Sequence, residues 1–494
     1  MEATKKSKSG IVPITIWAKI WTVMFLLTEI AFIVFMSITN IFPLKYFIFL
    51  IAMMVIATVL ILPLLCSQKE KAGRRRTGMV LATIISVFLI MGSYYLYSTN
   101  NLFGTISKDD KQTEDFHVMV LKEGSYKEVE EIKDKDIFVS EGGTASFIDA
   151  KIELKDEYKV NYKTAGNYME LGHQLVDEDG KTHDNIIFVS SVNYDMLCEE
   201  ITDFKENTKI LHTISIEMES KDIAKHINVT EEPFNMYISG IDTYGNINKV
   251  SRSDVNMIMT VDPINKKILL TSIPRDMYVT LHSYGEKDKL THSGIYGAEE
   301  TVATVEDWLG IDINYYLRVN FTTLEDVVDV IGGIDVQSDF SFTSHVSDYS
   351  YVKGINHMNG EKALFFARER YTFASGDRQR IKNQQLVIQG IINKILGDKS
   401  LLLKYPQLLG AVRDQMRTNM LDDDIAALVK MQLNDMSGWE IETSSITGTG
   451  TSAMTYSGGN RKLYVMVPND NSVLEAVEKI KKITDQPQPE QSEN

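Results

Sequence analysis

Two aspartates, Asp242 and Asp254, stand at the ends of neighbouring predicted strands. Asp242 closes the segment Gly240–Asp242 after one apolar strand, and Asp254 closes Ser251–Asp254 just before the next. Two carboxylates brought together in this way can hold a hard divalent cation, because Mg²⁺ takes oxygen ligands and keeps waters or phosphate oxygens as the rest. Turn residues that cap loops would show the same spacing. The pattern therefore predicts either a site for Mg²⁺, with Mn²⁺ as a substitute, or a structural turn.

A second charged pair, Arg275 and Asp276, follows the apolar predicted strand Lys267–Ile273 after a single proline. A strand this apolar should be buried, so that Arg275 emerges at the end of the sheet, where the loops of α/β proteins gather their ligands. The alternative is a structural ion pair between the two side chains. Arg275 is thus a candidate ligand-binding residue.

The third charged segment carries four arginines within 13 residues, from Arg368 to Arg380. Arg368 and Arg370 close one predicted helix, and Asp377 is placed as the N-cap of the next. Arg380 and Gln384 are four residues apart and share a face of that second helix. Planar guanidinium groups beside a helix N-terminus suit a phosphate or diphosphate. A solvated charged face is the alternative.

These charged segments belong to a region, 229–484, in which predicted strands alternate with predicted helices. Such alternation indicates a layered α/β fold, with a sheet flanked by helices. Strands are predicted over Phe234–Ile241, Val255–Val261, Lys267–Ile273, Tyr315–Val319, Trp439–Ile446 and Leu463–Val467, and helices over Gly297–Leu309, Thr323–Ile331, Glu361–Glu369, Arg378–Leu396, Leu401–Arg417, Asp422–Met436 and Val473–Ile483.

The preceding region, 98–228, reads as a small α/β domain of mixed order. Its short β-type runs are His117–Leu121, Asp136–Val139, Ile186–Val189 and Thr213–Glu217, and its predicted helices are Val192–Glu206 and Lys221–Ile227. The sequence there contains no nucleophile–base pair, metal-ligand cluster or glycine-rich phosphate loop, so we expect an accessory or interaction domain. The last ten residues, 485–494, are rich in Pro, Gln, Glu and Ser and predict a disordered tail.

The first hundred residues predict a membrane anchor of three helices over 14–97, after a short tail at 1–13. The apolar stretches Ile14–Ile38, Leu44–Leu65 and Met79–Tyr97 each approach the ~20 residues that a helix needs to cross a bilayer. Glu29 lies inside the first stretch and predicts either a partner on another helix or a place near the outer interface.

Basic residues set the orientation of this anchor. The tail and the second loop, 67–77, carry Lys and Arg, including Arg74–Arg76, whereas the first loop is almost uncharged. Lys and Arg remain on the cytoplasmic side. We therefore expect a multi-pass protein of the cell membrane whose N-terminus is inside and whose residues after Tyr97 are outside. Arg74–Arg76 is interpreted as a topology anchor; a patch for nucleic acid or lipid head groups is the alternative.

The charge and cysteine content of the region after Tyr97 indicate which kinds of partner it can bind. Only three of the 67 acidic residues, but ten of the 51 Lys and Arg, lie before Ser98, which leaves the remainder with a formal balance of −23. A body this acidic is a poor partner for nucleic acid, whose affinity comes from basic groups on phosphates. Cys66 and Cys198 fall on opposite sides of the predicted membrane boundary, so they cannot form a disulfide framework. An exported protein without disulfides fits a Gram-positive bacterial surface.

Together the three charged segments resemble the LytR-CpsA-Psr family of bacterial cell-envelope proteins. The anchor and accessory domain are similar to those of its streptococcal capsule-locus members. The matching motifs, all within residues 234–395, are Gly-Ile-Asp242 with Ser-Arg252-Ser-Asp254, Ile-Pro-Arg275-Asp276, and Arg368-x-Arg370 followed by Asp377-x-x-Arg380 and Gln384. One departure is Asn383, where many members have arginine, so this helix is expected to offer one fewer positive charge.

The resemblance implies a phosphotransferase that moves capsular polysaccharide from a polyprenyl-diphosphate carrier to peptidoglycan. Asp242 and Asp254 would hold Mg²⁺, and Asp276 or Asp377 would accept the proton of the attacking sugar hydroxyl. An apolar pocket between sheet and helices would take the lipid chain. The diphosphate would contact Arg252, Arg275, Arg368, Arg370, Arg380 and Gln384.

The implied partners are the carrier-linked polysaccharide, peptidoglycan, membrane lipid and other membrane proteins of capsule assembly. Hydrolysis of the diphosphate is an expected side activity. The alternative function is a non-catalytic membrane regulator of capsule synthesis or transcription. Against it, the 11 residues of the second loop, 67–77, are too few for a DNA-binding fold.

Overall fold

The computed structural model divides the chain into two compact units, one of residues 1–104 and 422–436 and one of 105–421 and 437–494. Asp242 lies outside the residues that the structure describes, as do the predicted tail at 1–13, all but the first residue of the predicted tail at 485–494, and most of the predicted helix Leu401–Arg417. The described residues are 16–39, 43–67, 72–106, 111–219, 222–241, 247–374, 376–398, 401, 416–459 and 461–485.

The first unit holds the three predicted membrane helices. They are α1 (Ile16–Thr39), α2 (Leu44–Leu65) and α3 (Ala72–Ile106), and all are long and apolar enough to cross a membrane. The chain is already helical at Ala72, so Arg74–Arg76 lie in the first turns of α3 rather than in a loop. The unit also contains α14 (Asp422–Asp435).

Glu29 of α1 is buried and finds its partner on another helix. Oγ1 of Thr58 in α2 lies 2.8 Å from each carboxylate oxygen of Glu29 and donates a hydrogen bond to it. A polar group inside an apolar bundle needs such a partner, because lipid offers none. Of the two expectations for Glu29, the structure shows the interhelical pair.

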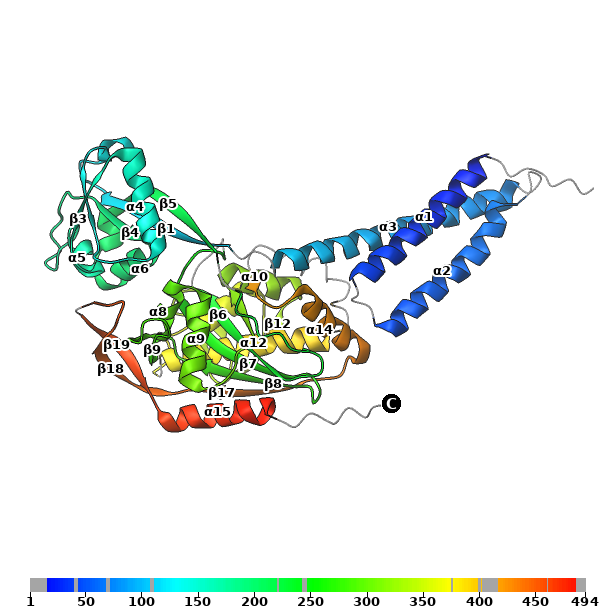
Figure 1. Ribbon diagram of the computed structural model, residues 1–494. Coiled ribbons are helices and arrows are strands. Elements are labelled where there is room, and N and C mark those ends of the chain that lie inside the picture. Colours follow the sequence, from blue (N-terminus) through cyan, green and yellow to red (C-terminus); the bar gives the residue numbers. More distant parts are fainter. Residues whose placement is uncertain are drawn as a thin grey trace, which may run out of the picture. The chain divides into compact units, whose positions relative to one another are not determined.

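The second unit begins with a five-stranded sheet in the order β3-β2-β4-β1-β5 (Figure 1). The three strands β3, β2 and β4 run parallel to one another, and β1 is antiparallel to both β4 and β5. The strands are β1 (Lys111–Leu121), β2 (Asp136–Val139), β3 (Asn161–Thr164), β4 (Ile187–Ser190) and β5 (Thr208–Glu219). The helices are η2 (Val129–Ile132), α4 (Ala145–Tyr158), α5 (Tyr168–Gly172), α6 (Ser191–Glu200) and α7 (Phe204–Asn207).

This accessory domain confirms the predicted mixed α/β character but differs in detail. Helix α4 and strand β3 were not predicted, and the residues 222–227 have no regular structure although a helix was expected there. Helix α4 has a weak apolar periodicity and begins at Thr144, whose side chain accepts a hydrogen bond from the backbone N–H of Phe147. That N-cap, rather than the apolar pattern, is the local signal for the helix.

The core of the second unit is a six-stranded mixed sheet in the order β16-β11-β6-β7-β8-β17. The central strands β6, β7 and β8 form an antiparallel meander, β11 and β17 add on parallel to β6 and β8, and β16 is antiparallel to β11. The strands are β6 (Phe234–Ile241), β7 (Ser253–Asp262), β8 (Lys267–Ile273), β11 (Tyr315–Val319), β16 (Met416–Thr418) and β17 (Glu440–Ser445).

Helices cover both faces of this sheet, as the layered prediction requires. Alternating residues of β6 separate the faces, because successive side chains of a strand point to opposite sides. Tyr237 packs in a cluster with α9 (Ala298–Leu309) and α15 (Asp470–Thr484), whereas Ile238 faces α10 (Phe321–Val330), α11 (Gly360–Arg368) and α12 (Asp377–Gly397). The three helices α10, α11 and α12 thus form the layer over the second face.

Buried polar side chains hold α12 in place. Nε2 of Gln385 donates to the backbone carbonyls of Leu270 in β8, at 2.7 Å, and Ser444 in β17, at 2.9 Å. Nδ2 of Asn383 donates to the carbonyl of Phe366 in α11. These contacts fix the rotation of the helix, so that Arg380 and Gln384 face a cavity instead of the core.

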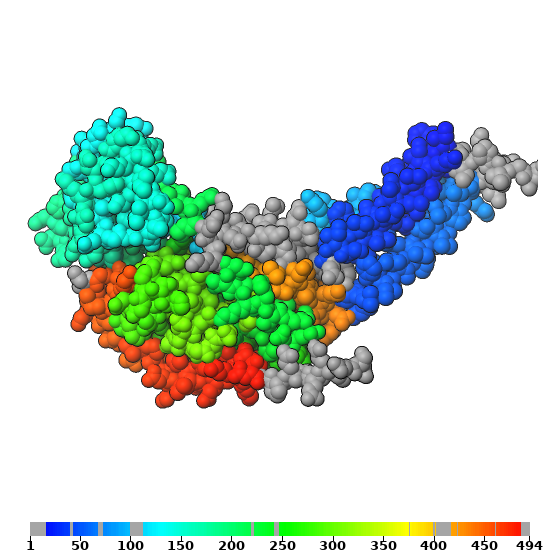
Figure 2. Space-filling view, viewed as in Figure 1, coloured from blue at the N-terminus to red at the C-terminus, as the bar shows by residue number. Residues whose placement is uncertain are grey.

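Four two-stranded sheets and two short helices are the remaining described elements of the second unit. In the space-filling view the C-terminal segments, in red, pack continuously against the green part of the same domain (Figure 2). The remaining elements are β9 (Tyr278–Thr280), β10 (Lys287–Lys289), α8 (Leu290–Ser293), η3 (Gly294–Tyr296), β12 (Ile334–Ser338), β13 (Phe342–Thr343), β14 (Ser350–Tyr351), β15 (Gly354–Met358), β18 (Gly448–Met454) and β19 (Lys462–Pro468).

Candidate functional site

A cavity of about 380 Å³ lies between the second face of the sheet and the layer formed by α10, α11 and α12. Most of its wall is apolar and comes from strands and helices alike, with Ile238, Val255, Val319, Leu324, Leu364, Phe365, Val387 and Ile388 among the lining residues. Charged and polar residues line the rest: Glu199, Asp254, Arg275, Arg368, Glu369, Arg370, Arg380 and Gln384. One cavity therefore offers a surface for a hydrocarbon chain and a cationic surface for an anionic head.

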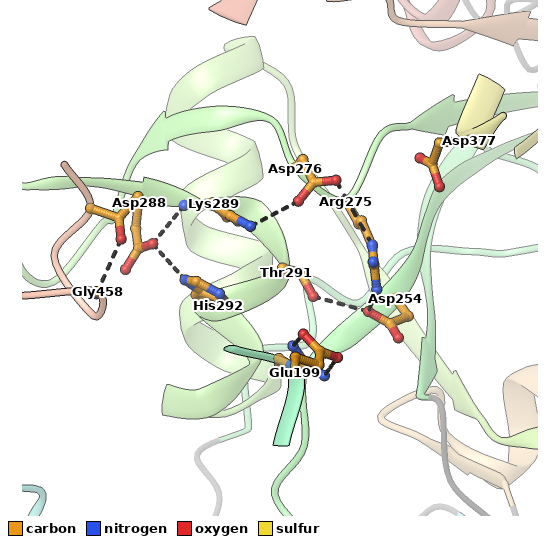
Figure 3. Close-up of polar contacts among 12 residues, drawn as sticks. Glu199, Asp254, Arg275, Asp276, Asp288, Lys289, Thr291, His292, Asp377 and Gly458 are labelled. Atoms are coloured by element: carbon orange, nitrogen blue, oxygen red, sulfur yellow. Dashed lines mark hydrogen bonds and ion pairs between the residues drawn. The ribbon is translucent and has the colours of Figure 1, made fainter. Parts of the chain in front are cut away.

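Asp254 and Arg275 meet at the charged part of the cavity (Figure 3). Nη1 of Arg275 donates to Oδ1 of Asp254 at 2.9 Å, and Oγ1 of Thr291 lies 3.3 Å from the same oxygen. Burial alone would raise the pKa of Asp254, but the guanidinium groups of Arg275 and Arg252 outweigh it and hold the pKa below its ordinary value. Asp254 is therefore an anion at neutral pH.

Arg275 and Arg380 each have a hydrogen-bond donor that finds no acceptor among the described residues. Among the described residues, neither buried Nε–H group has a hydrogen-bond partner, although Oδ2 of Asp276 lies 3.9 Å from Nε of Arg275. Burial lowers the pKa of Arg380, and the nearby charge of Arg275 lowers it further, against the opposing effect of Asp377. The positive charges of Arg275 and Arg380 are therefore not fully compensated by the described residues, and an anionic ligand would compensate them.

Arg368 and Arg370 extend the cationic surface from the end of α11. The guanidinium carbon of Arg368 lies 4.2 Å from the ring centroid of Phe321, a cation–π contact that holds the group at the cavity wall. That of Arg370 lies 5.3 Å from the ring of Tyr371. Four arginines from the predicted set therefore line one cavity, together with Gln384.

The buried carboxylate of Glu369 organises the loop between α11 and α12. Oε1 accepts hydrogen bonds from the backbone N–H groups of Arg370, Tyr371 and Thr372, and Oε2 accepts one from His345. Burial opposes ionisation, but these hydrogen bonds hold the pKa of Glu369 below its ordinary value. Glu369 was not predicted as a site residue, although it stands between Arg368 and Arg370.

The accessory domain also contributes to the site through Glu199 of α6. Its carboxylate accepts two hydrogen bonds from Arg252, at 2.8 and 2.5 Å, in a bidentate pair. Glu199 lines the cavity, but Arg252 does not. No sequence motif could have indicated Glu199, because it lies 53 residues before its partner, in a helix of the accessory domain.

Asp276 and Asp377 each form an ion pair with a basic residue next to the cavity. Asp276 pairs with Nζ of Lys289 at 3.2 Å, and Asp377 pairs with Arg380 at 2.5 Å; neither carboxylate lines the cavity. Asp377 is the first residue of α12, and the N-cap is Gly376, so the N-cap expectation was wrong by one residue. The side chain of Asn383 is buried against α11 and does not line the cavity.

Of the two carboxylates expected to bind a divalent cation, only Asp254 can be described, because Asp242 lies outside the described residues. In the described part of the chain no group of three His, Cys, Asp or Glu side chains could hold a metal ion. Both protein contacts of Asp254 are to Oδ1, so within that part Oδ2 is not engaged. One ionised carboxylate suits Mg²⁺, which is commonly bound by one or two carboxylates plus substrate phosphates and waters.

Comparison with known proteins gives a family match and named relatives. The LytR_cpsA_psr family model matches residues 201–480. The polyisoprenyl-teichoic acid–peptidoglycan teichoic acid transferase TagU of Enterococcus faecalis is 36% identical over 224 residues, which cover 44% of this chain and 72% of that protein. The protein of the same name from Bacillus cereus is 35% identical over 204 residues, which cover 41% of this chain and 66% of its own. The crystal structure of B. subtilis TagV shares 30% identity and covers 52% of this chain and 99% of its own, with a TM-score of 0.44.

The matched residues include the whole six-stranded sheet and all residues that line the charged cavity except Glu199. The resemblance indicated by the three charged segments is confirmed, since all of them lie within the matched residues. This chain belongs to the LytR-CpsA-Psr family.

Proposed function

We propose that this protein transfers a glycopolymer, specifically a capsular polysaccharide, from a polyprenyl-diphosphate carrier to peptidoglycan. The observation that carries the proposal is the cavity that joins an apolar wall to Arg275, Arg368, Arg370 and Arg380. A lipid diphosphate has the same two-part chemistry. The transferase name of the Enterococcus faecalis relative supports the reaction type.

The arginines would bind the diphosphate and stabilise charge during transfer. Phosphoryl transfer needs positioning and charge neutralisation more than covalent help from the protein. The unpartnered Nε–H groups of Arg275 and Arg380 provide donors for phosphate oxygens. Because they are buried, their electrostatic effect is stronger than it would be in water. The apolar wall would take the polyprenyl chain.

The transfer is a displacement at the phosphorus that carries the glycan. A hydroxyl oxygen of peptidoglycan forms a bond to that phosphorus, while the bond to the bridging oxygen breaks and its electron pair leaves with polyprenyl phosphate. The hydroxyl proton passes to a carboxylate. Asp276 or Asp377 would take this role; Asp276 pairs with Lys289 and Asp377 with Arg380 beside the cavity.

Mg²⁺ would be held by Asp254, with Asp242 as the second carboxylate, and Mn²⁺ could replace it. When bound, the ion would supply positive charge to the diphosphate oxygens. The protein's own contribution is to keep Asp254 ionised through Arg275 and Arg252 and to fix its orientation through Thr291.

The basic residues of the anchor support an orientation with the N-terminus in the cytoplasm and the charged cavity outside the cell. Carrier-linked polymers are presented on the outer surface of the membrane before they are attached to the wall. Three helices of membrane-spanning length would keep the enzyme beside its lipid substrate.

The proposal is tested with the full chain in detergent, supplied with a polyprenyl-diphosphate-linked glycan and peptidoglycan fragments. Polyprenyl phosphate and the joined glycan–wall product are followed by mass spectrometry. Removing Arg275 (Arg275→Ala) should lower the rate by about 10²–10³-fold, as loss of a charge-stabilising donor does elsewhere. Arg461→Ala is the control, since this half-exposed arginine pairs with Glu200 outside the cavity. A wild-type protein that releases no polyprenyl phosphate would refute the proposal.

A further inference from the structure

A second cavity, of about 550 Å³, lies between the accessory domain and three tyrosines of the region 229–484. Tyr284 stands at the centre of this tyrosine cluster, with its ring centroid 4.6 Å from that of Tyr296 and 4.7 Å from that of Tyr456. Tyr284 is 39% exposed and Tyr456 is 45% exposed. Aromatic rings of this size are normally buried or matched to a partner, so an exposed cluster inside a cavity indicates a ligand surface.

The accessory domain forms the opposite wall of this tyrosine cavity. Besides the rings of Phe116 and Phe147, it presents the carboxylates of Glu141 and Glu170, the amide of Asn193 and the hydroxyl of Ser190. No Lys or Arg is among the described residues that line it. The chemistry is the reverse of the arginine-lined cavity. An anionic ligand would be repelled here, whereas hydroxyl and amide groups would find acceptors and donors.

Two consecutive residues, Asp288 and Lys289, contact residues beside each of the two cavities. Figure 3 shows Lys289 directed at Asp276 and Asp288 next to His292. Lys289 pairs with Asp276, the neighbour of Arg275. Asp288 is fully buried, and its Oδ2 accepts the backbone N–H of Ser457 at 2.8 Å; Ser457 lines the tyrosine cavity. His292 lies 2.7 Å from both Oδ1 of Asp288 and Oγ of Ser457. The same short segment therefore positions both sites.

We propose that the tyrosine cavity is a binding site for a glycan chain of uncharged sugars. The C–H faces of sugar rings pack on aromatic rings, while their hydroxyl and acetamido groups bond to carboxylates, amides and hydroxyls. The volume is within the range of small-ligand sites, about 300–1,000 Å³. This inference deepens the proposed transferase function and rests on it, since both substrates of that reaction carry glycan.

The glycan can come from the wall or from the carrier-linked polymer, and binding measurements separate the two. The full chain in detergent is titrated with a β-1,4-linked N-acetylglucosamine tetramer, which represents the wall backbone. A parallel titration uses an oligosaccharide cut from the carrier-linked polymer. Binding of either probe supports the site and identifies its source.

Four variants and one control locate the binding. Tyr284→Ala and Tyr456→Ala should each weaken the glycan affinity about tenfold, because a packed ring contributes of order 1 kcal/mol. Tyr284→Phe and Tyr456→Phe keep the ring and should stay within about twofold. Tyr464→Ala is the control, because Tyr464 of β19 is 52% exposed and does not line the cavity.

Two results would overturn the proposal: no binding of either glycan by the wild-type chain, or equal binding by the wild type and both alanine variants. Unfolding of one alanine variant would leave the other tyrosine as an independent test. Failure of the transferase function is recognised separately. It would appear as no release of polyprenyl phosphate by the wild type, whereas Tyr456→Ala should leave the affinity for polyprenyl diphosphate unchanged.

Discussion

Arg380 and Arg378 lie two residues apart in the first turn of α12 but have different surroundings. Arg380 lines the cavity, and Arg378 is exposed and contacts the carbonyl of Gly448. Removing Arg380 (Arg380→Ala) should weaken binding of polyprenyl diphosphate by about 10–100-fold, the usual loss for a hydrogen bond to a charged group. Arg378→Ala should stay within about twofold in the same titration. Equal losses in the two variants would show that general surface charge, and not the cavity, binds the lipid.

The contribution of Glu369 to folding stability should depend on pH. Its pKa is lowered in the folded protein, so its stabilising effect is complete above the unfolded value of about 4.3 and is lost as the pH falls through the folded value. Glu369→Gln should therefore lower the melting temperature at pH 7, with a cost of about 1–3 kcal/mol for the weakened hydrogen bonds. The difference from the wild type should remain constant down to pH ~5 and shrink below pH ~4. A difference that persists unchanged at pH ~3 would contradict this account of Glu369.

The residues of the site were predictable where they stand in short motifs at the ends of strands and helices. Asp254, Arg275 and Arg380 follow that rule, and the structure places all three at one cavity. Glu199 could not be predicted, because only the packing of the accessory domain brings it to the site. Arg252 was expected at the diphosphate; its guanidinium group pairs with Glu199, and Arg252 is not among the described residues that line the cavity.

At the scale of elements, α12 determines which side chains reach the ligand. Gln385 anchors this helix to carbonyls of β8 and β17. Gln385→Leu keeps the approximate size but leaves buried acceptors unpaired, so it should destabilise the protein by about 1–3 kcal/mol. Gln389→Leu, on a partly exposed turn of the same helix, is the matched control. Thermal unfolding of both variants in detergent measures the effect, and equal melting temperatures would rule out the anchor.

The order of strands and helices was largely readable from apolar periodicity. Long runs such as Phe234–Ile241 and the helix from Arg378 to Leu396 appear where expected. One of the elements that were not predicted has a weak pattern. Strand β18 (Gly448–Met454) contains glycine, threonine and serine and is mostly exposed, so neither composition nor alternation marks it. Its pairing with β19 decides its structure, and that pairing is a long-range property.

At the scale of the whole molecule, the orientation of the anchor can be tested on intact cells. Protoplasts treated with an external protease should lose the region after α3, whereas an N-terminal tag should be protected. The reason is that the basic residues of the N-terminal tail and of the segment 67–77 are expected to remain on the cytoplasmic side. Permeabilised protoplasts are the control, in which both ends should be digested. Protection of the large C-terminal part in intact protoplasts would reverse the proposed topology.

The central claim is that the glycan-bearing phosphorus of the carrier ends up joined to peptidoglycan. The most direct measurement labels that phosphorus and follows it during incubation of the full chain with carrier-linked glycan, peptidoglycan fragments and Mg²⁺. We predict that the label appears in the wall product, that unlabelled polyprenyl phosphate is released, and that Asp254→Asn abolishes both. Label that appears only in free glycan phosphate would make the protein a hydrolase, and label that stays on an intact, bound carrier would make it a non-catalytic regulator.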